Sequence, residues 1–190
     1  YIKKLREICD DNELLLMIDE VQSGFCRTGK WFGYQHDQIL PDVIMLAKAL
    51  GNGVPIGACL ASGKASNLLQ PGSHGSTFGG NYLSTSVGLK VLDIMRDMNL
   101  CRNAREMGIY FLEKLNEIIA SKPVIKDIRC KGMMIGIELD RECADIVIKA
   151  LDHGLVLNVT KNNIIRMLPP LIIKKAEIDD IVNILDKVIV

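Results

Sequence analysis

The sequence predicts an α/β protein with a sheet-forming first half and a mixed second half. In the first half, the apolar runs Leu14–Ile18 and Val43–Ala47 stop abruptly at Asp19 and Lys48. Short continuous apolar runs of this kind are typical of strands that are buried on both faces. In the second half, apolar residues recur every three or four positions over long stretches, which indicates amphipathic helices. Strands and helices in one chain together predict an α/β fold.

The first half is expected to contain three strands joined by loops. Tyr1–Asp10 has the pattern of the end of a helix, and the strand Leu14–Ile18 follows it. A second strand, Val43–Ala47, and a third, Ile56–Ala61, come after glycine-containing connections. Gly72–Asn81 shows no period and is rich in glycine and serine, so it is expected to be a loop.

The second half alternates helices with short strands. Helices are expected over Leu83–Met98, Cys101–Ala120, Arg141–Asp152 and Lys175–Val188, and strands over Val124–Arg129, Met133–Leu139, Leu155–Val159 and Ile164–Leu168. We therefore expect two domains. Residues 1–100 would form part of an α/β domain, and residues 101–190 a small α+β domain.

Bulk composition argues against several classes of protein. Lys plus Arg (23) balances Asp plus Glu (23), so no net field draws the chain to nucleic acid or to an anionic membrane. No apolar run is long enough to span a bilayer, and no signal-peptide pattern is present. The six cysteines form no C-x-x-C pair and no cluster with histidine, so no metal site is indicated. A cytoplasmic protein is expected.

One glycine-rich segment looks like a nucleotide-binding phosphate loop but lacks its essential parts. Gly24–Lys30 fits the pattern G-x-x-x-x-G-K, yet Trp31 stands where a serine or threonine would bind magnesium. No convincing helix follows to direct its amides at a phosphate. We interpret the segment as a turn.

Three features near the predicted strands have a chemistry in common. Asp19 leaves one buried strand, where a carboxylate can keep a ring nitrogen protonated, as pyridoxal phosphate (PLP) requires of its pyridine. Lys48 leaves another, where burial would favour a neutral, nucleophilic amine. The loop Gly75–Asn81 offers hydroxyls and accessible amides of the kind that hold a phosphate. Each feature also has a purely structural explanation, as a cap, a solvated lysine or an ordinary turn.

The order and spacing of several sequence blocks favour the chemical explanation. Lys48 lies 29 residues after Asp19, and Thr77 lies 29 residues after Lys48. These residues and their surroundings closely resemble the class III aminotransferases of the ornithine and acetylornithine type. The blocks that carry the resemblance are IDEVQSG at 18–24, RTG at 27–29, PDV at 41–43, AKALG at 47–51, GSTFGGN at 75–81, RCKGMMIG at 129–136, NVT at 158–160 and IRMLPPL at 165–171. The resemblance implies a PLP-dependent transferase of fold type I, like aspartate aminotransferase, with part of the large domain and a small α+β C-terminal domain.

The resemblance implies a role for each residue around Asp19 and Lys48. Lys48 would hold PLP covalently and then act as general base and acid for the proton shift. Asp19 would pair with the pyridine nitrogen, Val21 would pack on the ring face, and Gln22 would hydrogen-bond the phenolic oxygen. Glu20 is assigned to cofactor binding with them, and bracing of the Asp19 turn is the alternative.

The later blocks imply groups for the phosphate and the substrate. Thr77 would bind the cofactor phosphate and Ser76 would lie near the substrate, both in the neighbouring subunit's site, which implies a homodimer with shared active sites. Arg166 would recognise a carboxylate through its bidentate guanidinium, and a surface arginine beside an edge strand is the alternative. GLVLNV at 154–159 and LPPL at 168–171 are most similar to the acetylornithine branch of the class. That branch transfers an amino group from acetylornithine to 2-oxoglutarate in arginine biosynthesis, and in some bacteria also serves lysine biosynthesis through succinyldiaminopimelate.

Two other interpretations stay open. The same fold and lysine could serve another donor, such as ornithine or 4-aminobutyrate, or an aminomutase. The chain could also be an inactive fragment, because class members are roughly twice as long. Their N-terminal part supplies a second phosphate loop, a stacking aromatic side chain and a substrate-binding arginine. We expect the 190-residue piece alone to bind PLP weakly and to be inactive, with strands 14–19 and 43–47 lacking neighbours.

The chain departs from the family pattern at two turns. Cys26 stands where relatives commonly have glycine, which would strain the backbone if that position requires a positive φ. Tyr82-Leu83-Ser84 replaces a Pro-Leu-Ala at the start of a helix, and so loses the pre-set φ of a first-turn proline. Neither change touches a group that is expected to bind the cofactor.

Overall fold

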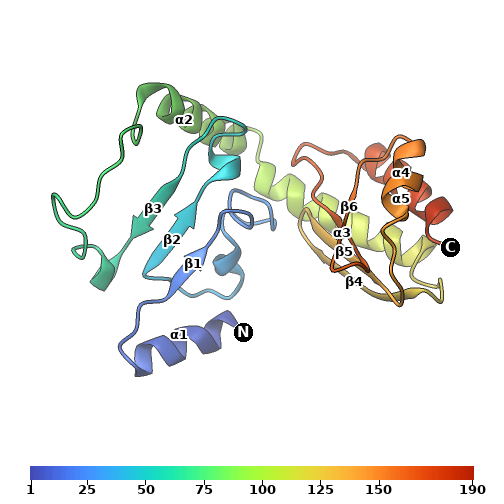
Figure 1. Cartoon of the computed structure of the whole chain (residues 1–190), viewed down its shortest axis with the longest axis horizontal. Coiled ribbons are helices and arrows are strands. Elements are labelled where there is room, and N and C mark those ends of the chain that lie inside the picture. Colours follow the sequence, from blue (N-terminus) through green and yellow to red (C-terminus); the bar gives the residue numbers. More distant parts are fainter. The chain divides into compact units, whose positions relative to one another are not determined.

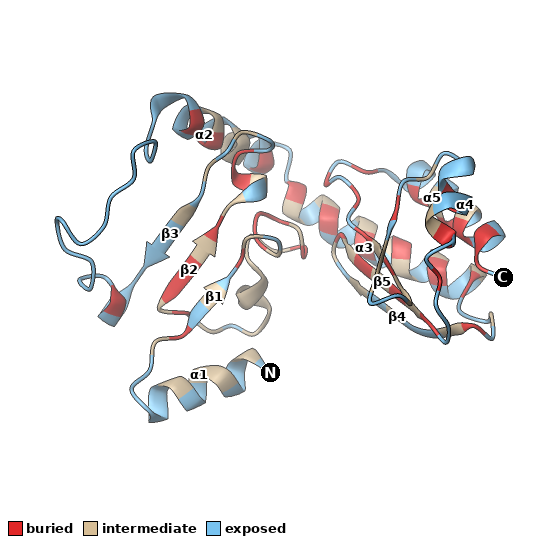
Figure 2. Cartoon of the chain, viewed as in Figure 1, coloured by how far each residue is buried: buried red, intermediate tan, exposed pale blue.

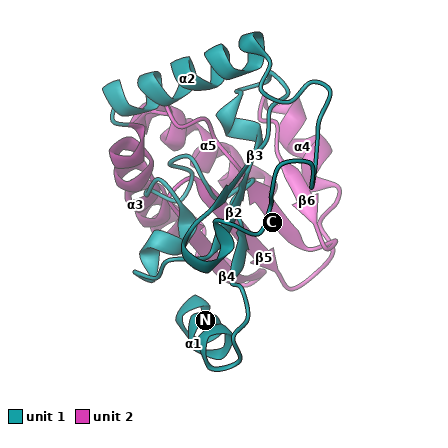
Figure 3. Ribbon diagram, turned by 90° about the vertical axis from the view of Figure 1, so that its left-hand side faces the viewer, with its two compact units in different colours: residues 1–99 teal, residues 100–190 magenta.

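The computed structural model describes all 190 residues, Tyr1–Val190. The chain forms two compact units, Tyr1–Asn99 (unit 1) and Leu100–Val190 (unit 2), which Figure 3 colours separately. Each unit has its own sheet and its own helices. No helix combines the length and the apolar character that crossing a bilayer requires.

Unit 1 is built on a three-stranded sheet with β2 (Val43–Leu46) in its centre (Figure 1). β1 (Met17–Asp19) pairs with β2 in parallel, and β3 (Ala58–Ala61) pairs with β2 antiparallel. Three of the four β2 residues are buried, as expected of an apolar run without alternation. Because β2 has a strand on each side, the expectation that residues 43–47 lack neighbours is wrong. The open edges belong to β1 and β3.

β1 is shorter than the apolar run that predicts it. Leu14 is 54% exposed and precedes the strand, which begins only at Met17. The Leu16 amide donates to the carboxylate of Asp42 at 2.7 Å instead of to a strand carbonyl. A side-chain acceptor has therefore replaced the ladder partner, and strand pairing starts one residue later.

Unit 1 contains two α-helices, α1 (Ile2–Asp11) and α2 (Tyr82–Asp97), and three short 3₁₀ turns, η1 (Gly33–His36), η2 (Lys48–Leu50) and η3 (Gly63–Ala65). The side chain of Asn81 caps α2, since its oxygen accepts a hydrogen bond from the Ser84 amide at 3.0 Å. This side-chain cap stabilises the helix start at which the family's proline is absent.

Unit 2 is a four-stranded antiparallel sheet with three helices. The strand order is β4 (Ile125–Lys131), β5 (Met134–Leu139), β7 (Ile164–Met167) and β6 (Asn158–Thr160), and the helices are α3 (Leu100–Ile118), α4 (Ile146–Asp152) and α5 (Lys175–Val188). Every second residue of β5 is buried, so one face of the sheet belongs to the core. Figure 2 shows further buried positions along α3. Phe111 and Leu115 of this helix are fully buried.

Two local features of unit 2 differ from or refine the sequence expectation. The helix expected over Arg141–Asp152 begins only at Ile146, and in the segment before it the Cys143 amide donates to the carbonyl of Asn162 at 2.8 Å. The turn between β4 and β5 contains Gly132 at a φ of 56°. α3 passes so close to it that a Cβ on Gly108 would lie 2.6 Å from the Gly132 carbonyl oxygen. Glycine is therefore required at both positions of this approach.

Candidate cofactor site

Asp19 and Lys48 lie at the same edge of the unit 1 sheet. Asp19 is the last residue of β1 and stands in register with Met45 of β2, and Lys48 follows the end of β2 by two residues. Neighbouring parallel strands end at the same edge of a sheet, where ligands of α/β folds bind. Both side chains are exposed. The fold thus brings together two residues that are 29 positions apart in the sequence.

The turn after β1 orients the Asp19 carboxylate. Oδ1 accepts a hydrogen bond from the Val21 amide at 2.9 Å, while Oδ2 accepts none within the chain. One oxygen is therefore held by the backbone, and the other is available to a protonated donor. Val21 is half-buried and Gln22 is exposed.

Lys48 has a backbone conformation that is rare for a residue with a side chain. Its φ is 45°, in the left-handed region, and its carbonyl accepts hydrogen bonds from the amides of Gly51 and Asn52 at 3.1 Å each. Non-glycine residues in such conformations gather at functional sites, where the surrounding structure holds them. The side chain is exposed, so the desolvation expected from the sequence is not supplied by this chain. The Lys48 ammonium makes no hydrogen bond or ion pair within the chain.

Glu20 differs from its neighbours because it is fully buried, at 1% exposure. Its Oε2 accepts hydrogen bonds from the Ser23 hydroxyl at 2.6 Å and the Gly33 amide at 3.0 Å, and its Oε1 accepts one from the Tyr34 amide at 2.9 Å. Sequence reasoning missed these partners. The serine three residues on was the one available signal, since Gly33 and Tyr34 come close only in the folded chain.

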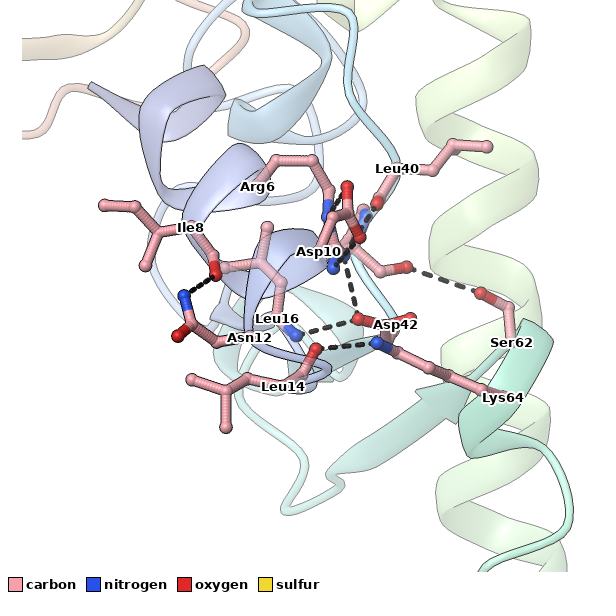
Figure 4. Close-up of polar contacts among 11 residues, drawn as sticks. Arg6, Ile8, Asp10, Asn12, Leu14, Leu16, Leu40, Asp42, Ser62 and Lys64 are labelled. Atoms are coloured by element: carbon pink, nitrogen blue, oxygen red, sulfur yellow. Dashed lines mark hydrogen bonds and ion pairs between the residues drawn. The ribbon is translucent and has the colours of Figure 1, made fainter.

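A second carboxylate, that of Asp42, anchors the start of β2. Its Oδ2 accepts hydrogen bonds from Arg6 at 2.8 Å and from the Leu16 amide at 2.7 Å, and Arg6 also pairs with Asp10 at 2.7 Å (Figure 4). The hydrogen bond from Arg6 is the main reason that the pKa of Asp42 lies below its ordinary value. The contact joins α1, the approach to β1, and the start of β2. It therefore fixes the two strands that lead to Asp19 and Lys48. Asp42 belongs to a block of the family resemblance, but the sequence suggested no role for it.

The glycine- and serine-rich loop is open to solvent. Residues 66–83 are exposed throughout (Figure 2). The Ser76 hydroxyl accepts a hydrogen bond from the Gly79 amide at 3.0 Å, and the Thr77 hydroxyl has no partner within the chain. A hollow of about 320 Å³ lies between this loop, the segment before β3 and the start of α2, and its lining includes Ile56, Ser76 and Asn81.

Arg166 belongs to unit 2, on β7. In a row across the sheet it stands next to Gly136 of β5, and Arg129 of β4 stands on the other side of Gly136. Because Gly136 has no side chain, the two arginines border a hollow of about 310 Å³. Arg166 is half-buried. A guanidinium beside such a hollow is suited to a carboxylate.

The groups of unit 1 fit PLP. Asp19, Lys48 and Thr77 are a carboxylate, an amine and a hydroxyl, and each has a polar atom without a partner in the chain. These are the kinds of group that the ring nitrogen, the aldehyde and the phosphate of PLP require. Glu20, by contrast, has both oxygens engaged.

Comparisons with known proteins point to the same family. The model of the family Aminotransferase class-III matches residues 1–189. Acetylornithine aminotransferase 1 of Bordetella bronchiseptica is 48% identical over 185 residues, which is 97% of this chain and 47% of that protein. The acetylornithine aminotransferase of Aquifex aeolicus is 48% identical over 189 residues, which is 100% of this chain and 48% of that protein. The chain spans about half the length of the curated relatives it matches.

Solved structures agree in fold. The ornithine aminotransferase of Toxoplasma gondii superposes with a TM-score of 0.93 at 35% identity, over 99% of this chain and 46% of that one. Another structure of the Toxoplasma enzyme records partial occupancy of PLP at its active site. The acetylornithine aminotransferase of Elizabethkingia anophelis gives 0.92 at 34% identity, over 98% of this chain and 48% of that one. The fold is therefore that of the PLP-dependent aminotransferases, and the resemblance seen in the sequence is confirmed: this chain belongs to the class III aminotransferase family.

Proposed function

We propose that the chain carries the lysine-bearing part of a PLP-dependent aminotransferase that moves the amino group of N-acetylornithine to 2-oxoglutarate, in arginine biosynthesis. The observation that carries the proposal is the placement of Asp19 and Lys48 at one edge of the unit 1 sheet, each with an uncommitted polar atom. The choice of donor is supported by curated relatives of 43–48% identity that are acetylornithine aminotransferases. Succinyldiaminopimelate, in lysine biosynthesis, is a further donor of the same kind.

When bound, PLP supplies an electron sink beside the amino-bearing carbon of the donor. Lys48 would hold the cofactor through Nζ. Once the amine of the donor has displaced that nitrogen, the freed Nζ would take the proton from the amino-bearing carbon and deliver it to the cofactor, acting first as general base and then as general acid. Asp19 uses Oδ2 to keep the ring nitrogen protonated, while the Val21 amide holds Oδ1 in place. Val21 packs on the ring face, and Gln22 donates to the phenolic oxygen.

The remaining groups bind anions. The Thr77 hydroxyl and nearby loop amides take the cofactor phosphate, and Ser76 lies near the substrate. Arg166 binds a substrate carboxylate through its guanidinium, in the hollow that Gly136 leaves open on the sheet of unit 2. We assign Thr77 and Ser76 to the partner subunit's site, so the working enzyme is a homodimer, and we place it in the cytoplasm.

Ornithine is the second candidate donor. The solved structures of ornithine aminotransferases match this chain with TM-scores of 0.93 at 35–36% identity. Their identity is lower than that of the curated acetylornithine enzymes, which favours the acetylated donor. A panel of acetylornithine, succinyldiaminopimelate, ornithine and 4-aminobutyrate, each tested as donor with 2-oxoglutarate, decides between them. Turnover of ornithine at a higher kcat/KM than acetylornithine would replace the first assignment by the second.

The cofactor assignment is tested on the chain itself. The purified chain is incubated with PLP and reduced with borohydride, and the site of attachment is located by mass spectrometry beside Lys48→Ala. Lys90→Ala, which removes an exposed lysine of α2, is the matched control. Attachment at residue 48 that is lost in Lys48→Ala and kept in Lys90→Ala supports the proposal. Equal labelling of all three proteins, or none, counts against it. A chain that attaches PLP but shows no turnover would be an inactive fragment of such an enzyme.

A further inference from the structure

Of the twelve largest fully buried side chains in the chain, Glu20 is the only one that lies in unit 1. We propose that Glu20 is a positioning residue: its carboxylate locks the loop Ser23–His36 onto the end of β1, and so holds Asp19 and Gln22 in the geometry that the cofactor needs. The inference rests on the proposed function, because Asp19 and Gln22 are the residues assigned to the cofactor ring.

The side chain of Glu20 works as a cap. Its two oxygens accept the amides of Gly33 and Tyr34, the first two residues of η1, and the Ser23 hydroxyl completes the set. Amides at the start of a helical turn have no partners within that turn, and a carboxylate is the acceptor that they bind most strongly. The residue that follows β1 therefore caps a turn that begins 13 residues later.

The backbone of Glu20 is held as firmly as its side chain. Its amide donates to the Met45 carbonyl at 3.0 Å, which continues the β1–β2 ladder, and its carbonyl accepts from the Gly24 amide at 3.0 Å. Successive side chains of an extended chain point to opposite sides. With Glu20 directed into the core, Asp19 is directed outward, in agreement with its exposure. The buried anchor thus sets the direction of the exposed carboxylate.

Two glycines show how closely the loop is pressed against this anchor. A Cβ on Gly24 would lie 2.7 Å from the Glu20 carbonyl oxygen, and one on Gly33 would lie 3.3 Å from both Glu20 Oε2 and the Ser23 Cβ. A side chain at Gly24 would force the loop backbone away from the Glu20 carbonyl, and one at Gly33 would displace the Glu20 carboxylate or Ser23 by a few tenths of an ångström. Gly33 has no positive φ, so a side chain there disturbs the contact without straining the backbone.

The loop is also held together by contacts of its own. The Lys30 ammonium donates to the Gln35 carbonyl at 2.9 Å, and the ring of Phe32 packs edge-on against Phe25 with centroids 5.8 Å apart. Phe25 is buried at 3% exposure. A carboxylate tied to such a loop cannot turn without breaking several contacts, so the adjoining Asp19–Gln22 turn is pre-organised rather than mobile.

The test compares Glu20→Gln and Gly33→Ala with Glu13→Gln, a control at an exposed glutamate outside the loop. Hydrogen exchange of the segment 17–24 is measured without PLP. The PLP dissociation constant and the pH midpoint of the absorbance band of the Lys48-bound cofactor are measured with it. That midpoint reports on the ring nitrogen, because a less firmly protonated ring withdraws fewer electrons from the lysine nitrogen.

For Glu20→Gln we expect exchange in 17–24 to quicken about tenfold, PLP to bind about tenfold more weakly and the pH midpoint to rise, with exchange in unit 2 unchanged. Gly33→Ala should change all three in the same direction, and Glu13→Gln none. Faster exchange with an unchanged dissociation constant and midpoint would make Glu20 purely structural and overturn the inference, while the proposed function stands. Failure of the parent chain to attach PLP counts against the proposed function. In that case the inference about Glu20 is judged only by hydrogen exchange of the segment 17–24, which is measured without PLP. Unchanged exchange of this segment in Glu20→Gln overturns the inference.

Discussion

At the scale of single residues, exposure separates the charged groups that hold the fold from those left for a ligand. Glu20 is fully buried and Asp42 is largely buried, and both accept hydrogen bonds from backbone amides. Asp19 and Lys48 are exposed and keep an uncommitted atom. Burying a carboxylate without partners is costly, so the satisfied groups are the structural ones.

Asp42→Asn is expected to lower the free energy of unfolding by about 1–3 kcal/mol at neutral pH, since Arg6 and the Leu16 amide lose a charged acceptor. The pKa of Asp42 is depressed, first by the hydrogen bond from Arg6. A depressed folded-state pKa stabilises the fold above the unfolded pKa of about 3.9, and the contribution is lost as pH falls through the folded value. The denaturant midpoints of Asp42→Asn and of the parent should therefore converge as the pH falls from about 5 to about 2, the range over which such groups titrate.

Asp152→Asn, which removes an exposed carboxylate of α4 that makes no ion pair within the chain, is the matched control. A gap between Asp42→Asn and the parent that stays constant down to the acid end would show that charge at Asp42 contributes nothing.

Asp19→Asn is expected to leave the fold intact and to weaken PLP binding. The side chain is exposed and makes one hydrogen bond, so the free energy of unfolding should change by under about 1 kcal/mol. Loss of a charge-assisted hydrogen bond to the ring nitrogen costs about 1.5–3 kcal/mol, or roughly 10- to 150-fold in the dissociation constant. Absorbance titration with PLP measures the change, and equal affinity for both proteins would remove Asp19 from the site.

At the scale of elements, α1 and α4 both end in a Schellman motif, a C-terminal cap that requires one residue in the left-handed conformation. The two helices place different residues at that position. α1 closes with Leu14 donating to the Cys9 carbonyl at 2.8 Å, and α4 closes with Leu155 donating to Ala150 at 2.9 Å. The left-handed position of the motif is occupied by Glu13 at a φ of 56° in α1 and by glycine at a φ of 81° in α4. The first arrangement carries strain that the second avoids.

Glu13→Gly should therefore raise the free energy of unfolding by about 0.5–1 kcal/mol, and Gly154→Ala should lower it by about 1 kcal/mol. A Cβ at Gly154 meets no atom within 4 Å, so the second effect isolates backbone strain. Denaturant unfolding of both variants measures the pair. Changes of the same sign would contradict the explanation.

The side chain of Lys122 caps the C-terminal end of α5. Its ammonium donates to the carbonyls of Asp186 and Ile189 at 2.6 and 2.7 Å and pairs with the Asp186 carboxylate at 2.9 Å. A cation at a helix C-terminus satisfies open carbonyls and complements the helix dipole. Lys122→Met should cost about 1–2 kcal/mol in thermal or denaturant unfolding, whereas Lys126→Met, at an exposed position of β4, should cost little. Equal losses in both variants would refute the capping role.

At the scale of the whole molecule, the core is unevenly divided. Of the twelve largest fully buried side chains, eleven lie in unit 2. Unit 1 has a three-stranded sheet with open edges on β1 and β3, and α1 contains no buried residue. A unit that buries little apolar surface opens at a lower free energy.

Hydrogen exchange of the chain should therefore be slowest in β5, β7 and α3, with unit 1 exchanging at least about tenfold faster. Addition of the segment that the longer relatives have and this chain does not should raise protection in β1 and α1 selectively. Slow exchange of unit 1 in the chain alone would mean that its core is more complete than its burial indicates.

The sequence by itself determined the family, the strand that ends at Asp19, the strand before Lys48 and the helices of the second half. These features rest on local patterns: continuous apolar runs, helical periodicity and motifs of a few residues. The expected start of β1 failed because a distant group intervenes: Asp42 shortens the strand by accepting the Leu16 amide.

Only the tertiary structure decided that Glu20 is the buried anchor and that Asp19 is the carboxylate left available to a ligand. Asp19 and Glu20 are neighbours of the same chemical type, and no local pattern assigns one to the solvent and the other to the core. The assignment depends on Gly33 and Tyr34, whose amides reach Glu20 across a loop, and on Met45, which continues the ladder past Asp19. Burial of a charge is favourable only where such distant donors converge, and their convergence is a property of the folded chain.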